Sequence, residues 1–187
     1  VIDAANGMAG KMLPPLLEEL PIEARRMYFE LDGTFPNHEA NPLKLENLRD
    51  LQKEVKESGG DLGVAFDGDA DRCVLVDDRG EPVSSDLVTA LLATYLLPKS
   101  EDTEAVVYDI RSSRVVKEEI EKHGGKPVRG RVGHSFMKAL MREHNALFGG
   151  ELSGHFYWRD YFFADSGVVA MINVLNLLSE KDRPLTE

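Results

Sequence analysis

The chain has 187 residues and a formal net charge of -11 at pH 7, from 33 acidic and 22 basic side chains. This negative field repels nucleic acids and anionic membranes, so neither is an expected partner, and a phosphate site would need a metal or a few concentrated cations. The hydrophobic fraction of 42% is that of an ordinary globular protein. The single cysteine, Cys73, has no intrachain partner, and no apolar stretch is long enough to span a bilayer, so we expect a cytoplasmic protein.

The N-terminal part of the chain alternates short apolar runs with amphipathic stretches. A glycine-bearing turn at 6–10 leads into a helix that ends at Leu20. Pro14 and Pro15 should lie in the first turn of this helix or before its regular part, because a helix interior needs the amide hydrogen that proline lacks. A loop rich in Gly, Pro and Asn follows at 32–42. The predicted strands are 1–5, 27–31, 62–66 and 73–76, and a second helix is predicted at 43–58.

A similar alternation continues after the turn Asp77-Asp78-Arg79-Gly80. An aromatic-rich segment at 156–163 follows the last predicted strand and a glycine-rich loop. The predicted strands are 105–110, 127–132 and 146–148, and the predicted helices are 86–97, 112–123, 135–145 and 166–178.

Strands separated by helices of this length predict βαβ units. We expect two consecutive α/β domains with mainly parallel mixed sheets, at 1–81 and 82–187. Because the chain opens inside a predicted strand, we expect a fragment of a longer protein. In such folds ligands bind at the carboxyl ends of strands, so the loops that begin at Asp67 and Gly149 are the expected sites.

The strongest local signal is the segment Asp67-Gly68-Asp69-Ala70-Asp71-Arg72 between two apolar strands. Three alternate carboxylates on a tight loop place about -3 of charge in a small volume, which is unfavourable without a cation. All-oxygen ligands favour Mg²⁺, Ca²⁺ or Mn²⁺ over zinc. An EF-hand would need Gly and Glu where the chain has Arg72 and Asp78. The alternative interpretation is a solvated acidic turn.

The loop Gly149-Gly150-Glu151-Leu152-Ser153-Gly154-His155 is the second signal. Its glycines let the backbone approach a ligand, and its carboxylate, hydroxyl and imidazole suit a sugar. The alternative is a glycine-rich hairpin whose polar residues are incidental.

Two cationic loops precede predicted helices and are candidate phosphate sites. They are Arg111-Ser112-Ser113-Arg114 and Arg131-Val132-Gly133-His134-Ser135, where hydroxyls and helix amides could join a guanidinium at an anion. Helix capping by Ser113 and Ser135 is expected in either case. The turn at 6–10 lacks the lysine of a P-loop, and tight packing of strand against helix explains its glycines.

Taken together and in order, these segments resemble the α-D-phosphohexomutase superfamily, of the phosphomannomutase/phosphoglucomutase type. The resemblance covers nearly the whole chain and implies the second and third of four domains. The matching segments are Asp3-Ala4-Ala5-Asn6-Gly7-Met8-Ala9-Gly10, Asp32-Gly33-Thr34-Phe35-Pro36-Asn37-His38, the Asp-Gly-Asp-x-Asp-Arg loop, Gly-His-Ser-x-x-Lys at 133–138 and Gly-Glu-x-Ser-Gly-His at 150–155.

The resemblance implies that Asp67, Asp69 and Asp71 bind Mg²⁺, with a phosphoserine oxygen completing the site. It implies that Arg72 contacts substrate beside the metal in a catalytic role.

In the second half the resemblance implies that Glu151 and Ser153 hold sugar hydroxyls. His134 and His155 would line the cleft, with a catalytic role for His155. Arg111 falls where this branch typically has a substrate-binding lysine, from which arginine differs in geometry.

The implied reaction interconverts hexose 1-phosphate and hexose 6-phosphate through a phosphoserine and a hexose 1,6-bisphosphate, which also serves as activator. The sequence departs from the family in lacking the phosphoserine motif and the last domain's phosphate loop. Those belong to domains I and IV, the expected partners in the same polypeptide, so the isolated chain should be inactive.

Three other functions are compatible with parts of the sequence. A phosphoglucosamine mutase usually has Gln where this chain has Leu152, which favours mannose or glucose phosphate. A haloacid-dehalogenase-type phosphatase uses Asp-x-Asp after a strand, but then has Thr or Val where this chain has Asp71. A non-catalytic cation- or sugar-binding module would need no further residues.

Overall fold

The computed structural model describes residues 1–186, which form two compact units. The first comprises Val1–Val83 together with the residues from Leu178 on, and the second comprises Ser84–Leu177. Each unit holds a five-stranded mixed sheet with helices, which confirms the predicted α/β class. Within residues 1–186, no helix combines the length and apolar character needed to cross a membrane.

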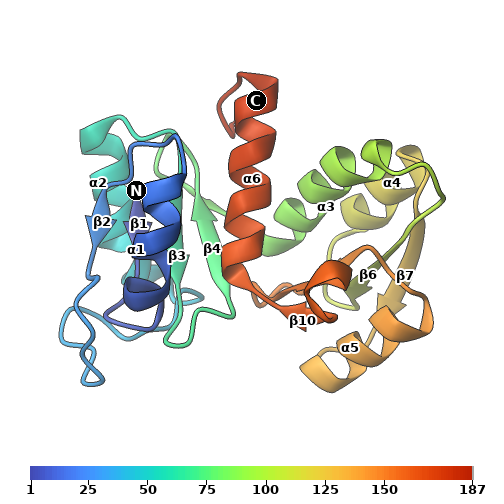
Figure 1. Ribbon diagram of the computed structural model, residues 1–187, viewed down its shortest axis with the longest axis horizontal. Coiled ribbons are helices and arrows are strands. Elements are labelled where there is room, and N and C mark those ends of the chain that lie inside the picture. Colours follow the sequence, from blue (N-terminus) through green and yellow to red (C-terminus); the bar gives the residue numbers. More distant parts are fainter. Residues whose placement is uncertain (187) are drawn as a thin grey trace. The chain divides into compact units, whose positions relative to one another are not determined.

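The sheet of the first unit has the strand order β2-β1-β3-β4-β5 (Figure 1). Strand β1 pairs parallel with β2 and β3, whereas β4 is antiparallel to both β3 and β5. In chain order the elements are β1 (Ile2–Asp3), α1 (Ala9–Glu19), β2 (Arg26–Met27), the 3-10 turn η1 (Leu45–Leu48), α2 (Arg49–Ser58), β3 (Gly63–Phe66), β4 (Cys73–Val76) and β5 (Pro82–Val83).

Helices α1 and α2 cover opposite faces of this sheet. The chain steps from β1 to β2 on one side and then back across β1 to β3, so two right-handed crossovers place their helices on different faces. Leu51 and Val55 of α2 pack with Ala65, Val74 and Val76 of the sheet. This burial fixes the ends of β3 and β4, between which the acidic loop lies.

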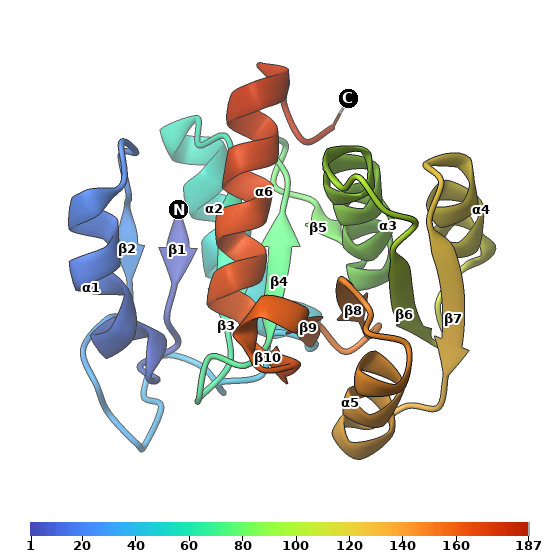
Figure 2. The same cartoon turned by 45° about the vertical axis from the view of Figure 1, so that its right-hand side comes forward.

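The sheet of the second unit has the strand order β10-β9-β8-β6-β7. Helices α3 and α4 contact each other beside β7 and β8, and α5 packs on β6, β7 and β8 (Figure 2). The elements are α3 (Ser85–Leu96), η2 (Leu97–Lys99), β6 (Ala105–Asp109), α4 (Arg114–Lys122), β7 (Lys126–Gly130), α5 (His134–Glu143), β8 (Phe148–Gly150), β9 (Phe156–Trp158), η3 (Arg159–Tyr161), β10 (Ala164–Asp165) and α6 (Gly167–Lys181). The last turn of α6, from Leu178 on, belongs to the first unit.

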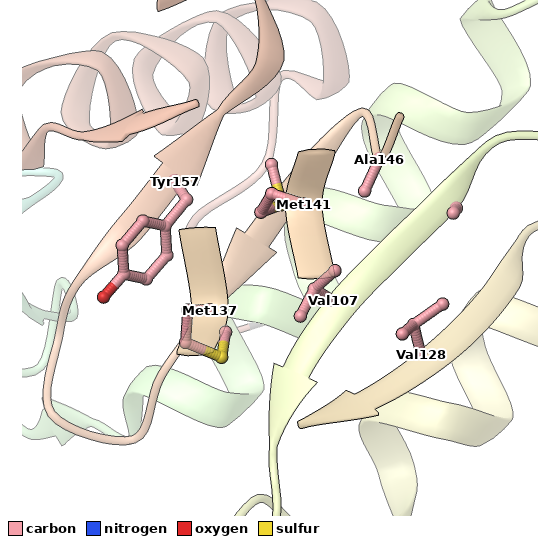
Figure 3. Packing of buried hydrophobic residues seen from close by; sticks show 7 residues of the cluster. Val107, Val128, Met137, Met141, Ala146 and Tyr157 are labelled. Carbon is pink, nitrogen blue, oxygen red and sulfur yellow. The ribbon is translucent and has the colours of Figure 1, made fainter. Parts of the chain in front are cut away.

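The core beneath α5 holds this helix against the sheet (Figure 3). Met137 and Met141 are fully buried and pack with Val107 of β6 and Tyr157 of β9. Burying each such side chain contributes roughly 1.5–3 kcal/mol. The packing therefore fixes the N-terminal end of α5, where His134 lies, relative to the hairpin formed by β8 and β9.

The two units repeat one topology. Strand β6 pairs parallel with β7 and β8, and β9 is antiparallel to β8 and β10, as in the first sheet. The β3–β4 hairpin therefore corresponds to the β8–β9 hairpin. The first carries the acidic loop and the second carries the glycine-rich loop, so both candidate ligand loops occupy the same position in the repeat.

Some local predictions were wrong. Pro14 and Pro15 lie beyond the first turn, inside α1, which begins at Ala9. Their missing amides remove two helical hydrogen bonds, and the burial of Leu13 and Leu17 on the same helix offsets this loss. Antiparallel pairs also make up half of each sheet, a larger share than the sequence indicated.

Candidate functional site

The acidic loop closes the β3–β4 hairpin at the carboxyl end of β3. Phe66 pairs with Cys73 across the hairpin, so 67–72 form the connection. Ala70 has a φ of 65°, in the left-handed region, and its amide donates to the Asp67 carbonyl oxygen at 3.3 Å. This turn directs alternate side chains to a common side, as a cation site requires.

The three predicted metal ligands come together. One carboxylate oxygen each from Asp67, Asp69 and Asp71 lies within 4.8 Å of the others. Asp67 is buried, Asp71 is half-buried and Asp69 is exposed. The donor set is all oxygen, converges on one point and is open on one side, so it fits Mg²⁺ with further ligands supplied by water or substrate.

Arg72 compensates part of this negative charge. Its Nε donates to Asp67 Oδ2 at 2.6 Å, and its backbone amide lies 3.2 Å from Asp67 Oδ1. The same Nε is 3.9 Å from Asp71 Oδ1. The predicted role of Arg72 was substrate contact, and the structure adds that this side chain holds the buried carboxylate of the loop.

Glu151 lies at the start of the second loop and is only 1% exposed. Its Oε1 accepts the Gly133 amide hydrogen at 2.8 Å, and its Oε2 accepts the Tyr157 hydroxyl hydrogen at 2.6 Å. Glu151 therefore ties the turn before α5 to strand β9. Sequence reasoning selected Glu151 but gave neither of these partners.

The other predicted sugar-loop residues gather around Glu151. Ser153 Oγ lies 2.9 Å from His155 Nδ1, which is 3.7 Å from Glu151 Oε2. The rings of His134 and His155 meet edge to face, with centroids 4.3 Å apart. Two imidazoles, a hydroxyl and a carboxylate thus share one side of the second unit, a set able to bind hydroxyl groups and to exchange protons.

Asp165 lies beside His134 and was missed by sequence reasoning. His134 Nδ1 lies 2.9 Å from Asp165 Oδ2, and Lys138 Nζ lies 2.8 Å from Asp165 Oδ1. Burial alone would raise the pKa of Asp165, but the Lys138 hydrogen bond and the nearby positive charge outweigh it and lower the pKa. The available signal was Lys138, which follows His134 by one helical turn on α5.

Arg111 pairs with Asp109, another residue that sequence reasoning missed. One guanidinium nitrogen is 2.8 Å from Asp109 Oδ2, which also accepts the Leu152 amide hydrogen at 2.8 Å. Burial would raise the pKa of Asp109, but these bonds and the Arg111 amide hold it below its usual range. Asp109 thereby ties Arg111 to the loop that carries Glu151. A carboxylate at the end of the buried strand β6 was the available signal.

The predicted capping serines do not cap their helices. Ser113, the N-cap residue of α4, makes no side-chain cap hydrogen bond, and Ser135 lies inside α5, whose N-cap position is occupied by Gly133. The Ser113 amide donates to Asp86 Oδ2 of α3 at 2.8 Å. A buried carboxylate thus already occupies an amide at the α4 terminus, which weakens the prediction of an anion site there.

Comparison with known proteins places the chain in a family. The model described as "Phosphoglucomutase/phosphomannomutase, alpha/beta/alpha domain II" matches residues 1–80, and that for domain III matches residues 84–187. These matches agree with two α/β units that carry an acidic loop and a glycine-rich loop. The chain belongs to the phosphoglucomutase/phosphomannomutase family.

Among its relatives is a phosphomannomutase/phosphoglucomutase of Pseudomonas syringae pv. tomato, 40% identical over 97% of this chain and 39% of the relative. A phosphomannomutase of Methanocaldococcus jannaschii is 39% identical over 100% of this chain and 41% of the relative. A crystal structure of a family protein from Burkholderia thailandensis matches with a TM-score of 0.91 and 33% identity over 96% of this chain and 39% of that one. The chain therefore spans about two fifths of the length of these relatives.

Proposed function

We propose that this chain is the central part of a phosphohexomutase that interconverts hexose 1-phosphate and hexose 6-phosphate, with mannose or glucose as the sugar. The relatives named phosphomannomutase and phosphoglucomutase support this class of reaction. The observation that carries the proposal is the convergence of Asp67, Asp69 and Asp71 within 4.8 Å on the β3–β4 hairpin of such a chain.

In this proposal the acidic loop holds Mg²⁺ through its three carboxylates. When bound, the ion neutralises charge that develops on the phosphoryl oxygens in the loose transition state. Arg72 shields Asp67 before the cation arrives. Its guanidinium then serves the transferring phosphoryl group, for which a rigid, planar set of donors is well suited.

Glu151 and Ser153 bind the sugar hydroxyls. An ionised carboxylate offers about four acceptor sites, and Glu151 uses one on each oxygen for Gly133 and Tyr157. The remaining acceptor sites take hydroxyl hydrogens from the sugar. Because its two protein partners fix the carboxylate, little side-chain entropy is lost when the substrate binds.

His134, His155 and Arg111 complete the substrate side of the second unit. His134 lies beside the Asp165 carboxylate, with Nδ1 2.9 Å from Oδ2, and in this proposal its imidazole lines the substrate cleft. His155 serves as a proton-transfer group beside the sugar hydroxyls, and Arg111 contacts the substrate while Asp109 fixes its orientation.

The phosphoryl carrier is expected outside these 187 residues. The family's phosphoserine motif does not occur in the sequence, and Ser153 already contacts His155. A mutase must store a phosphoryl group between its two half-reactions, through a phosphoserine and a hexose 1,6-bisphosphate in this proposal. The chain alone is expected to bind ligands without turnover, and domains I and IV of the same polypeptide would supply the rest. We propose the cytoplasm as its location.

Binding measurements on the 187-residue chain test the proposal. Mn²⁺, followed by electron paramagnetic resonance, should bind the wild type and compete with Mg²⁺. Asp69→Asn should weaken this binding, while the exposed Asp61→Asn control should not. Equal binding by both variants would remove the metal assignment.

The sugar site needs a separate experiment. Titration with mannose 1-phosphate or glucose 6-phosphate should shift the amide resonances of 151–155 in heteronuclear NMR spectra. Ser153→Ala should reduce the affinity, and Thr103→Ala, which removes an exposed hydroxyl from the segment before β6, should leave it unchanged. Resonances of this loop that stay fixed at saturating hexose phosphate would contradict the sugar assignment.

A further inference from the structure

The acidic loop must hold three like charges close together before any cation arrives. Arg72 offsets one of them, and the remaining carboxylates repel each other. Within the loop, the Ala70 amide donates to the Asp67 carbonyl oxygen, and the Arg72 amide donates to the Asp67 carboxylate. These bonds close the turn, but neither uses a hydrogen-bonding group of the peptide that joins Gly68 to Asp69.

That peptide is held from another part of the first unit. The Met8 amide donates to the Gly68 carbonyl oxygen at 2.9 Å. The Gly68 carbonyl belongs to the peptide that joins Gly68 to Asp69, so this bond sets the orientation of the peptide that precedes the second candidate ligand.

The contact depends on glycine at position 7. A Cβ atom at Gly7 would lie 2.7 Å from the Gly68 oxygen and 3.0 Å from its Cα. Both are backbone atoms of the acidic loop, and neither can rotate away as a flexible side chain would. Any side chain at position 7 therefore displaces the loop or the turn.

Asn6 anchors the turn that presents Gly7 and Met8. Its backbone is in the left-handed region, with a φ of 57°, and it is 5% exposed. Its backbone amide donates to the Tyr28 carbonyl oxygen, and its side-chain nitrogen donates to the Glu30 carbonyl oxygen, each at 2.8 Å. Its Oδ1 accepts from the side-chain nitrogen of Asn37, also at 2.8 Å. With so many fixed bonds, the turn is a rigid support.

We propose that the 4–8 turn is a positioning element for the divalent-cation site, acting through the close approach of Gly7 and the amide of Met8. This inference rests on the proposed role of the Asp67–Asp71 carboxylates as metal ligands. The turn touches no ligand itself. It fixes the backbone on which Asp69 is mounted, so that the carboxylate oxygens converge without a rearrangement that would weaken binding.

The experiment compares Gly7→Ala with Gly33→Ala, a matched control where an added Cβ meets nothing within 4 Å. Mn²⁺ affinity is measured by electron paramagnetic resonance on the 187-residue chain. We expect Gly7→Ala to bind Mn²⁺ roughly 10- to 100-fold more weakly, the range found when the outer support of metal ligands is lost. Gly33→Ala should match the wild type.

A second readout follows the loop without metal. Gly7→Ala should shift the amide resonances of Asp69 and Ala70, while those of β3 stay in place. Asn6→Gly, which tolerates the left-handed backbone but lacks the side-chain anchors, should weaken Mn²⁺ binding even if Gly7→Ala does not fold.

The outcomes separate the two proposals. If the wild type binds Mn²⁺ and Gly7→Ala and Asn6→Gly bind it equally well, the positioning role is overturned and the metal site stands. Equal weakening by Gly33→Ala would also overturn it, since the effect would then be general. A wild type that binds no Mn²⁺ overturns the metal site and this inference with it.

Discussion

Removal of the Glu151 carboxylate should destabilise the second unit as well as impair sugar binding. Glu151→Ala removes the hydrogen bonds that the buried Tyr157 hydroxyl and the half-buried Gly133 amide donate to its carboxylate. A hydrogen bond to a charged group contributes about 1.5–3 kcal/mol, and water can reach the Gly133 amide in part. We therefore expect a loss of about 2–4 kcal/mol in the free energy of unfolding.

The single tryptophan makes this measurable. Trp158 is buried in β9, next to Tyr157, so its fluorescence in urea follows the unfolding of the second unit. The exposed Glu121→Ala should change the free energy of unfolding by less than about 0.5 kcal/mol.

A double-mutant cycle isolates the contact itself. Glu151→Gln and Tyr157→Phe should show a coupling energy of about 1 kcal/mol or more, because the two side chains share a buried hydrogen bond. Additive effects, or a Glu151→Ala variant as stable as the wild type, would refute the view that the hydrogen bond between Glu151 and Tyr157 stabilises the second unit.

Two further predictions concern pH. Because its bonds to Arg111 and Leu152 lower the pKa of Asp109, the stability it contributes is present above its unfolded pKa of about 3.9 and is lost as pH falls through the folded pKa. The urea midpoint of unfolding, followed by Trp158 fluorescence, should therefore fall at acid pH in the wild type and fall less steeply in Asp109→Asn. An unchanged slope would contradict this. In the first unit a hydrogen bond to Asp3 raises the pKa of His38, so its contribution is complete below about pH 6.5 and is lost as pH rises through the folded pKa. Proton NMR should give a His38 pKa above about 6.5, and an Asp3→Asn value equally high would show that Asp3 is not the cause.

The sequence predicted the fold class and the positions of both ligand loops because these depend on local patterns. Apolar strands on either side of 67–72 were visible, and so was the alternation of carboxylates within it. The strand Cys73–Val76 has its predicted bounds. Other strands are shorter than predicted. A strand was predicted at 27–31, but β2 comprises only Arg26–Met27, because the apolar residues continue beyond the last residue that pairs with β1.

Contacts between distant segments could not be predicted in this way. The partners of Glu151 come from the turn before α5 and from β9, and nothing in the spacing of Gly133 and Tyr157 indicates that they share one carboxylate. The capping prediction was also wrong. Ser113 has a side chain suited to an N-cap, but its Oγ makes no cap hydrogen bond, and its own amide donates to Asp86 of α3, a partner that local sequence does not indicate.

For the Asn6-Gly7-Met8 turn, the sequence also predicted a close contact without identifying the contacting residue. Its glycine was correctly linked to close packing, but the expected neighbour was a helix against a strand. The atoms that exclude a side chain at Gly7 belong to Gly68, far along the chain. Local sequence can indicate that a backbone approaches something closely, whereas only the fold identifies what it approaches.

The repeated topology places two different chemistries on one kind of hairpin. The β3–β4 connection runs from the Phe66–Cys73 pair and the β8–β9 connection from the Gly150–Phe156 pair, so the two differ in length by one residue. The paired strands form the hydrogen-bonded sheet, whereas the connecting residues lie outside the ladder and can differ between the two units. With the same strand order and pairing, the first hairpin carries carboxylates and the second carries a carboxylate, a hydroxyl and an imidazole. Because each connection begins and ends at a paired strand position, the two hairpins are suitable places for loop exchange in protein engineering.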